Sequence, residues 1–272
     1  MASHETPRPE RFNISLTTPA GELTTSIEAP ATLVPITAIV PLARRLGEEA
    51  TALEQTQEQE AGRPISCRKG CAACCRMLVP VSAPEAFALK AMVDALPKER
   101  RDIVLDKLTQ AQARLQDAGL LARLAALAEA DTPLRDEDME PMNRAYYALR
   151  MACPFLEEEH CSIYEDRPAA CRELLVTTPA DLCNDLINNP VRSLPAPVRV
   201  GTVLALLWSE LTSTPPTLIP LPLALNWAEK HAGEGQGVWR GTQLLEQMLE
   251  KVWRLLEQEF ANREAGGAAP GT

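Results

Sequence analysis

Aromatic residues, histidines and long hydrophobic runs are scarce in this sequence. Aromatic side chains make up 4% of the 272 residues, and only three histidines occur. Ala, Leu and Glu are abundant instead, which favours helices over the aromatic-rich strands of a β-sandwich or β-barrel. The most apolar segment, residues 200–208, is much shorter than the ~18 residues of a membrane-spanning helix, so no membrane partner is expected.

Positive charge is lacking as well. The formal net charge is −10 at pH 7, from 37 acidic and 27 basic residues. Because nucleic acids and anionic membranes attract basic surfaces, this balance argues against either of them as a partner.

The first residues, MASHETPRPERFN, have neither the basic start nor the apolar core of a secretory signal, which predicts a cytoplasmic protein with reduced thiols.

Cysteine is the residue in excess. The eight cysteines form one group at Cys67, Cys71, Cys74 and Cys75, a second group at Cys153, Cys161 and Cys171, and an outlier at Cys183. Ordinary buried thiols would not cluster in this way, although free cysteine often packs like a small apolar residue. A disulfide framework would need an oxidising compartment and a higher cysteine density, roughly 8–10% of a short chain. The clustering therefore predicts a metal site, with all eight cysteines as candidate ligands.

The spacing of the cysteines leaves the kind of metal open. Thiolates suit both Zn²⁺ and iron–sulfur clusters. The first group matches neither the paired C-x2-C of a zinc ribbon nor the C-x2-C-x2-C run of a ferredoxin. Eight thiols could fill two tetrahedral sites, or hold one cluster with some left over. The expected cofactor is an iron–sulfur cluster, of the 4Fe-4S type, or Zn²⁺.

The first cysteine group has a basic local sequence. Cys67, Cys71 and Cys74 would share one face of a helix, but Gly70 interrupts it, so we expect a helix that begins near Cys71. No acidic residue occurs over 61–84, and a local positive charge favours thiolates. The basic residues of this stretch are Arg63, Arg68, Lys69 and Arg76.

The second group and the outlier lie near predicted helix starts. Pro168 suits the first turn of a helix that has Asp166 as its N-cap, which places Cys171 near the start of that helix. The helix dipole stabilises a thiolate at such a position. Residues 178–181, with the sequence TPAD, repeat this start signal just before Cys183.

Several neighbours of the cysteines receive lesser roles. His160 follows three glutamates and is expected in an exposed loop rather than on the metal. Arg167 and Arg172 are expected to pair with cluster sulfurs or with nearby acids.

Cys75 adjoins Cys74 and would point about 100° away from it on a helix. Cys75 could therefore bridge two metal ions, face a second site or act as a reactive thiol. The acidic runs are expected to be solvated. Three tyrosines are expected to pack: Tyr146, Tyr147 and Tyr164.

The hydrophobic pattern predicts helices and one hairpin. Apolar residues alternate at 12–16 and again at 23–27, on either side of Pro19-Ala20-Gly21, which indicates two strands. Helical spacing is then found in several segments. They cover 33–60, a helix opened by Pro84, another opened by Pro97 and broken near Gly119, 143–151, 200–211 and 244–260, with an exposed loop expected over 131–141.

These patterns together predict a mainly α protein. We expect a single irregular helical domain folded around a cysteine-ligated metal centre, with a small N-terminal β-hairpin. Residues 1–30 would form a tail and the hairpin. Residues 31–262 would form the α-rich metal-binding domain, with its core motif at 64–185. Residues 263–272 would form a disordered tail.

The sequences around the cysteines also carry a family resemblance. CRKGCAACCR is followed by CPFL, HCSIY and EDRPAACR, and together these fit the pattern C-x(2,3)-C-x2-CC, CPFL, C-x-IY-x-x-RP-x-x-CR. Over about residues 64–175 the chain thus resembles the YkgJ-type cysteine-cluster family, CxxCxxCC. The resemblance implies a zinc- or iron-chelating site, or an iron–sulfur site. The cysteine portion is also similar to flagellin lysine N-methylases. Cys183 lies outside the pattern.

Two functions follow from these observations. The first is a metal-binding protein whose centre is structural, redox-active or used in metal handling, with a protein or peptide as a further partner. The alternative is a metalloenzyme that modifies a protein or peptide side chain, as a methylase does. The sequence contains no Gly-rich phosphate loop, GxSxG or HExxH motif, which favours the first.

Overall fold

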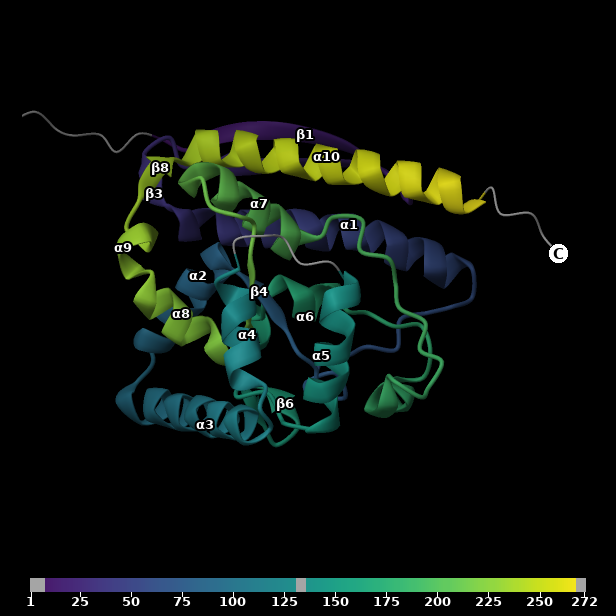
Figure 1. Cartoon of the computed structure of the whole chain (residues 1–272). Coiled ribbons are helices and arrows are strands. Elements are labelled where there is room, and N and C mark those ends of the chain that lie inside the picture. The colour runs from purple at the N-terminus through teal and green to yellow at the C-terminus, as the bar shows by residue number, and fades with distance from the viewer. Residues whose placement is uncertain (1–7, 131–135, 268–272) are drawn as a thin grey trace, which may run out of the picture.

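The structure is a computed structural model that describes residues 8–130 and 136–267. Most of these residues lie in helices, as the composition predicts, and the strands pair in short antiparallel sheets of two. α10 (Gly241–Gly267) and α1 (Val40–Glu60) lie along one edge of the molecule, α3 (Lys98–Asp117) lies along the opposite edge, and shorter helices and loops lie between them (Figure 1). None of the helices in the described part of the chain has the length and hydropathy to cross a membrane.

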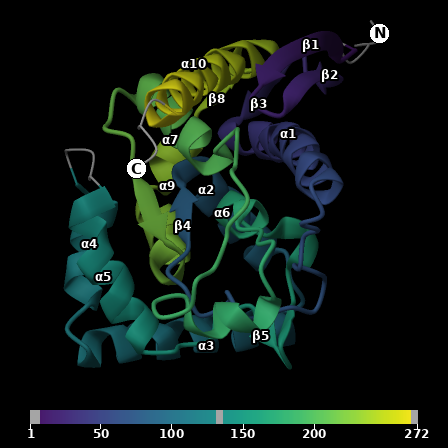
Figure 2. The ribbon, with the colours of Figure 1, turned by 90° about the vertical axis from the view of Figure 1, so that its right-hand side faces the viewer.

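The predicted N-terminal hairpin is present. It consists of β1 (Glu10–Thr18) and β2 (Gly21–Ala29), which pair antiparallel. Alternate side chains of a strand point to one face, and on this hairpin that face is buried through Ile14, Leu16, Leu23 and Ile27. It packs against α1 (Val40–Glu60) and α10 (Gly241–Gly267), as Figure 2 shows at the upper edge of the molecule. These contacts stabilise two strands that would be marginal alone.

The helix expected over residues 33–60 begins later than predicted. Residues Leu33–Pro35 form a strand, β3, which pairs with β8 (Val238–Arg240) near the other end of the chain. A 3-10 turn, η1 (Ile36–Ile39), then leads into α1. Pro35 disfavours a helical conformation in the residue before it, and the partner strand supplies the hydrogen bonds that a helix would otherwise make.

The next helices begin near the predicted prolines. Pro84 lies in the first turn of α2 (Ala83–Asp94), and Pro97 directly precedes α3 (Lys98–Asp117). Gly119, with a positive φ of 68°, separates α3 from α4 (Leu121–Ala128). Glycine adopts this conformation more readily than other residues, which is why the predicted break falls there.

The exposed loop expected over 131–141 is partly helical. Residues 131–135 lie outside the described part of the chain, but α5 (Asp136–Ala148) begins directly after them and includes Pro141. The prediction took Pro141 as a loop signal. The helix dipole favours acidic residues at the start of a helix. This favourable interaction offsets the loss of the backbone hydrogen bond that proline cannot donate.

Short elements carry the second half of the cysteines. These elements are β5 (Leu156–Glu157), β6 (His160–Cys161), η2 (Tyr164–Asp166), α6 (Ala169–Glu173) and η3 (Ala180–Asp185). β5 and β6 pair as a tight hairpin whose two turn residues, Glu158 and Glu159, both have positive φ angles of 48° and 59°. That conformation suits the right-handed twist of a two-residue hairpin.

Helices return after residue 199. α7 (Val200–Thr212) is buried on most sides, as its apolar sequence predicts. The elements that follow are β7 (Leu218–Pro220), which pairs with β4 (Pro80–Ser82), then η4 (Leu221–Leu223), α8 (Ala224–Lys230), α9 (Ala232–Gly235), β8 and α10.

The final helix is longer than the sequence pattern indicated. α10 reaches Gly267, so the first five residues of the tail expected at 263–272 are helical and the last five lie outside the described residues. Each residue added to the end of an existing helix forms one further backbone hydrogen bond, which favours such extension. The apolar stripe predicted for this helix is mostly buried, through Leu244, Leu245, Met248, Leu249, Val252 and Leu256. Phe260 is half-buried, and Trp253 is 48% exposed.

Two hydrophobic clusters form the core. The larger one combines the hairpin with α1, α2, α7, α8 and α10, and Cys153, Cys161 and Cys171 pack against it. The smaller one joins α3, α4 and α5 through residues such as Leu115, Leu124 and Met142. The cysteine-bearing loops therefore depend on helices from both ends of the chain.

The close approach of α1 and α7 gives the first prediction. A Cβ placed on Gly47 of α1 would lie 2.4 Å from Cγ2 of Val200 at the start of α7. Gly47→Ala should therefore lower the free energy of unfolding by about 1–3 kcal/mol through overpacking. Gly233→Ala is the matched control, since a Cβ there would meet no atom within 4 Å. Urea unfolding should separate the two variants, and equal stabilities would contradict this packing.

Candidate metal centre

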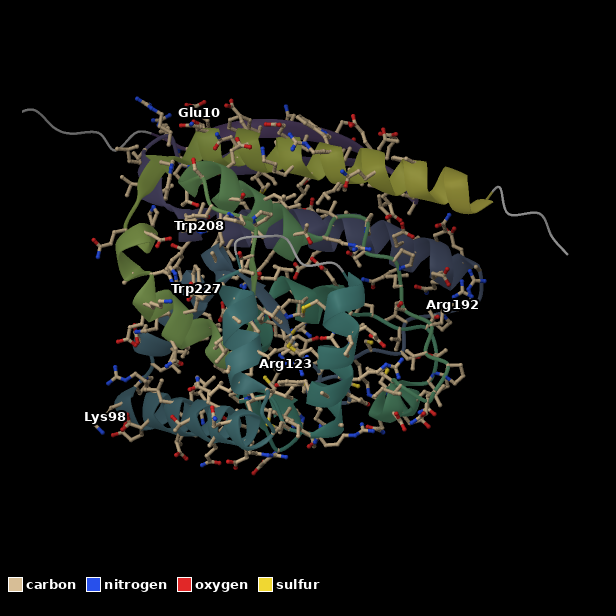
Figure 3. All side chains as sticks on the ribbon, viewed as in Figure 1. Glu10, Lys98, Arg123, Arg192, Trp208 and Trp227 are labelled. Atoms are coloured by element: carbon tan, nitrogen blue, oxygen red, sulfur yellow. The ribbon has the colours of Figure 1, made fainter. Side chains whose placement is uncertain are left out.

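The structure brings the cysteines together from irregular segments of the chain. All eight are free thiols; Cys183 is buried and the other seven are half-buried. The first group lies in the loop between α1 and β4, and the others lie in or beside the short elements from β5 to η3. Sulfur atoms, yellow in Figure 3, concentrate in the half of the molecule that holds α5 and α6.

The first group does not form the expected helix. Residues 67–77 form a series of turns, in which the amides of Cys71, Cys75 and Met77 donate to carbonyls three residues earlier at 3.0–3.1 Å. Gly70 has a φ of 90°, a left-handed conformation that a helix cannot include. The chain therefore bends around Cys67, Cys71 and Cys74 instead of aligning them along one helix face.

Backbone hydrogen bonds join the two groups. The amide of Cys153 donates to the carbonyl of Cys75 at 2.8 Å, which places the second group directly beside the first. The amide of Val176 donates to Sγ of Cys67 at 3.4 Å, and the amide of Ser66 donates to the carbonyl of Val176 at 2.9 Å. The segment that follows α6 thus forms one wall of the site.

The thiols affect one another in two sets that share Cys74. Burial raises the pKa of Cys171, and the negative charges of Cys153, Cys74 and Cys161 add to this increase. Burial also raises the pKa of Cys183, and here the charges of Cys67, Cys74 and Cys71 add to it. Cys183, the outlier in the sequence, therefore lies with the first group.

Cys74 and Cys75 form a hydrogen-bonded pair. The hydrogen bond from the Cys75 thiol lowers the pKa of Cys74 to about 7, despite the burial of Cys74. The same bond, followed by burial, raises the pKa of Cys75. The two neighbouring sulfurs therefore favour one shared negative charge, because the thiol of one stabilises the thiolate of the other.

The chemistry of this donor set fits a thiophilic cation. Burial raises the pKa of Cys153 to about 12 and raises that of Cys67 and Cys161 as well. A bound metal would supply the positive charge that buried thiolates lack, and it would displace their protons. Among the described residues, no three Cys, His, Asp or Glu side chains are already arranged closely enough to hold a metal ion.

Arg167 is a cation that acts on four of these eight thiols. Burial raises the pKa of Cys67, Cys161 and Cys171, and the guanidinium of Arg167 partly offsets that increase. Its guanidinium stacks on the Tyr164 ring at 3.7 Å from the ring centre, and its Nε donates to the Tyr164 carbonyl at 2.9 Å. Tyr164 thus orients the arginine beside the sulfurs.

The other basic residues are largely neutralised by acids. Arg76 forms two hydrogen bonds with Glu159, at 2.6 and 3.1 Å, and Arg63 donates to Glu58. Arg172 pairs with Glu48 of α1 and donates to backbone carbonyls instead of pairing with sulfur. The acidic run after Phe155 is therefore not simply solvated, because its members bind basic residues brought close by the fold.

His160 occupies the exposed position expected of it. Its Nδ1 lies 2.7 Å from the carbonyl oxygen of Glu158 in the hairpin turn, and its side chain is exposed. The ring also lies beside Gly70, where a Cβ would be 3.4 Å from Nε2. The hairpin therefore covers the first cysteine loop.

The sequence interpretation missed three residues that hold the site in place. Tyr147, expected only to pack, donates its hydroxyl proton to the carbonyl of Asn184 at 2.9 Å and accepts from the amide of Leu186 at 3.1 Å. Glu173 accepts from the amide of Val200 at 2.7 Å, and burial raises its pKa to about 7. The third residue is Glu85, a buried acid in the first turn of α2 that accepts from the amide of Ala169. Only Glu85 has a sequence signal, the Ser-x-x-Glu pattern of a capping box.

The Tyr147 hydrogen bonds lead to the second prediction. Tyr147→Phe should lower the free energy of unfolding by about 1–2 kcal/mol, because the amide of Leu186 loses its acceptor next to the Cys183 segment. Tyr146→Phe is the matched control, since it removes a neighbouring hydroxyl and leaves both bonds in place. Denaturant unfolding and the hydrogen exchange of Leu186 should both distinguish them. Unchanged exchange in Tyr147→Phe would show that the bonds contribute nothing.

Comparison with known families agrees with this arrangement. Residues 66–185 match the sequence model of the CxxCxxCC family, described as "Putative zinc- or iron-chelating domain". No curated protein and no solved structure matches the chain. The matched segment includes Cys183, which extends the resemblance beyond the residues that first indicated it. The family predicted from the cysteine motifs is thus confirmed, and residues 66–185 of this chain are a domain of the CxxCxxCC family.

Proposed function

We propose that this protein binds Zn²⁺ or an iron–sulfur cluster through the thiolates of its cysteines. The observation that carries the proposal is the convergence of eight free cysteines, from separate segments of residues 67–183, on one region of the fold. Thiolate ligands select soft and borderline metals, and hard cations such as Mg²⁺ prefer oxygen. When bound, such a centre supplies either structural cross-linking or one-electron transfer.

We further propose that the main site is formed by Cys153, Cys161 and Cys171, with Cys74 as the fourth ligand. The charge of Cys74 acts on each of the other three thiols, which indicates that Cys74 lies near all of them. Four thiolates complete either a tetrahedral zinc site or a cubane cluster. The remaining cysteines of the other set, Cys67, Cys71 and Cys183, act on one another as well as on Cys74 and would serve a second ion.

Metal analysis after anaerobic purification tests the proposal. We expect metal in stoichiometric amount, either as zinc in a colourless protein or as iron with acid-labile sulfide in a brown one. Cys171→Ser should abolish binding at the main site. Cys67→Ser should remove only the part of the metal held by the second set. A folded protein that retains no metal under these conditions would refute the proposed function.

A matched control separates loss of a ligand from damage to the fold. Ser162 follows Cys161 in the chain, and its hydroxyl donates to the carbonyl of Phe155 at 2.9 Å. Ser162→Ala should cost about 1 kcal/mol of stability and leave the metal content unchanged. Equal metal loss in Ser162→Ala and Cys171→Ser would mean that the thiol itself is not the ligand.

A further inference from the structure

Glu85 is a buried acid that joins three separate parts of the chain. Its side chain is 1% exposed and lies in the first turn of α2. Oε2 accepts hydrogen bonds from the hydroxyl and the amide of Ser82, at 2.9 and 3.3 Å. Oε1 accepts from the amide of Ala169 at 2.8 Å and from Nη2 of Arg44 at 3.3 Å. Both oxygens therefore accept two hydrogen bonds each, on a side chain that is almost completely buried.

The bond to Ala169 matters because Ala169 is the first residue of α6. This helix has only five residues and carries Cys171. So short a helix has no stability of its own, and its first amides have no partners within the helix. The sequence predicts Asp166 as the cap, but Asp166 lies in η2 and Pro168 occupies the cap position. A carboxylate from 84 residues earlier in the chain replaces it.

Other contacts hold the far end of α6. Glu173 accepts from the amide of Val200, which attaches the end of α6 to the start of α7. Arg172 forms an ion pair with Glu48 of α1. Glu85 is thus the contact that fixes the start of the helix, two residues from Cys171, while the other contacts act after it.

We propose that Glu85 is a positioning residue that sets the place of Cys171 in the metal centre. This inference rests on the proposed function. Metal ligands must stand within a fraction of an ångström of their bonding positions, and buried hydrogen-bond partners outside the ligand set provide that accuracy. Nη2 of Arg44 donates to Oε1 of Glu85, the same oxygen that accepts from the amide of Ala169, so a residue of α1, outside the matched family segment, takes part in positioning the ligand.

Glu85→Gln tests this role with little change in volume. The amide has one acceptor oxygen, and its NH₂ group would face donors, so it cannot accept from both Ser82 and Ala169 as the carboxylate does. We expect the affinity for Co²⁺, used as a probe for thiolate sites, to fall about 10–100-fold. The sulfur-to-Co²⁺ charge-transfer bands should also shift or weaken, since these report the geometry of the ligands.

Val93→Ala is the control for a general loss of stability. Val93 is fully buried on the same helix, and it lies more than two turns beyond Glu85. Its truncation should lower the stability of the fold and leave both the Co²⁺ affinity and the charge-transfer bands of the wild type unchanged. Glu85→Gln with wild-type affinity and spectrum would overturn the inference.

A second variant removes the same bond from the other side. Ala169→Pro deletes the amide hydrogen that Glu85 accepts, leaves the capping box of α2 intact, and places proline at a helix position that accepts it. It should reduce Co²⁺ affinity in the same range as Glu85→Gln, and it decides the question if Glu85→Gln does not fold. If the wild type binds no Co²⁺, Zn²⁺ or iron, the proposed function fails first. If the wild type binds and both variants bind equally well, only the role of Glu85 is refuted.

Discussion

Eight thiols must stay close together in a region partly closed to water, although the segments that carry them have little regular structure. Burial and mutual repulsion both oppose the charged form of these thiols, as the raised pKa values of Cys153 and Cys171 show. A bound metal would offset this cost through its charge. The protein contributes the positions of the sulfurs, and it does so with contacts that begin outside the cysteine loops.

Those contacts tie the family segment to the rest of the chain. Arg44 and Glu48 of α1 bind Glu85 and Arg172, and the start of α7 binds Glu173. The larger hydrophobic cluster likewise combines residues of the segment with the hairpin, α1, α7 and α10. The helices on either side of residues 66–185 therefore act as the rigid frame on which the loops are held.

Charge is arranged locally in a way that the overall acidity of the protein conceals. Arg63, Lys69 and Arg76 each pair with a glutamate, so three of the four basic residues around the first cysteines are matched by acids. Arg167, stacked on Tyr164, is the cation that favours thiolates in both cysteine groups. A single oriented guanidinium near several sulfurs affects their ionisation more than scattered exposed cations, which water and salt screen.

Local patterns were enough to predict the hairpin, the helices that begin near Pro84 and Pro97, the break at Gly119, and the family of the cysteine segment. Periodicity, prolines, glycines and motif spacing act over a few residues, so the chain encodes these features locally. Three other features arise only in the folded chain: the turns of residues 67–77 in place of a helix, the place of Cys183 beside the first group, and the cap of α6 by Glu85 in place of Asp166. Each of these depends on groups that are distant in the chain and meet only when the core forms, so no local pattern encodes them.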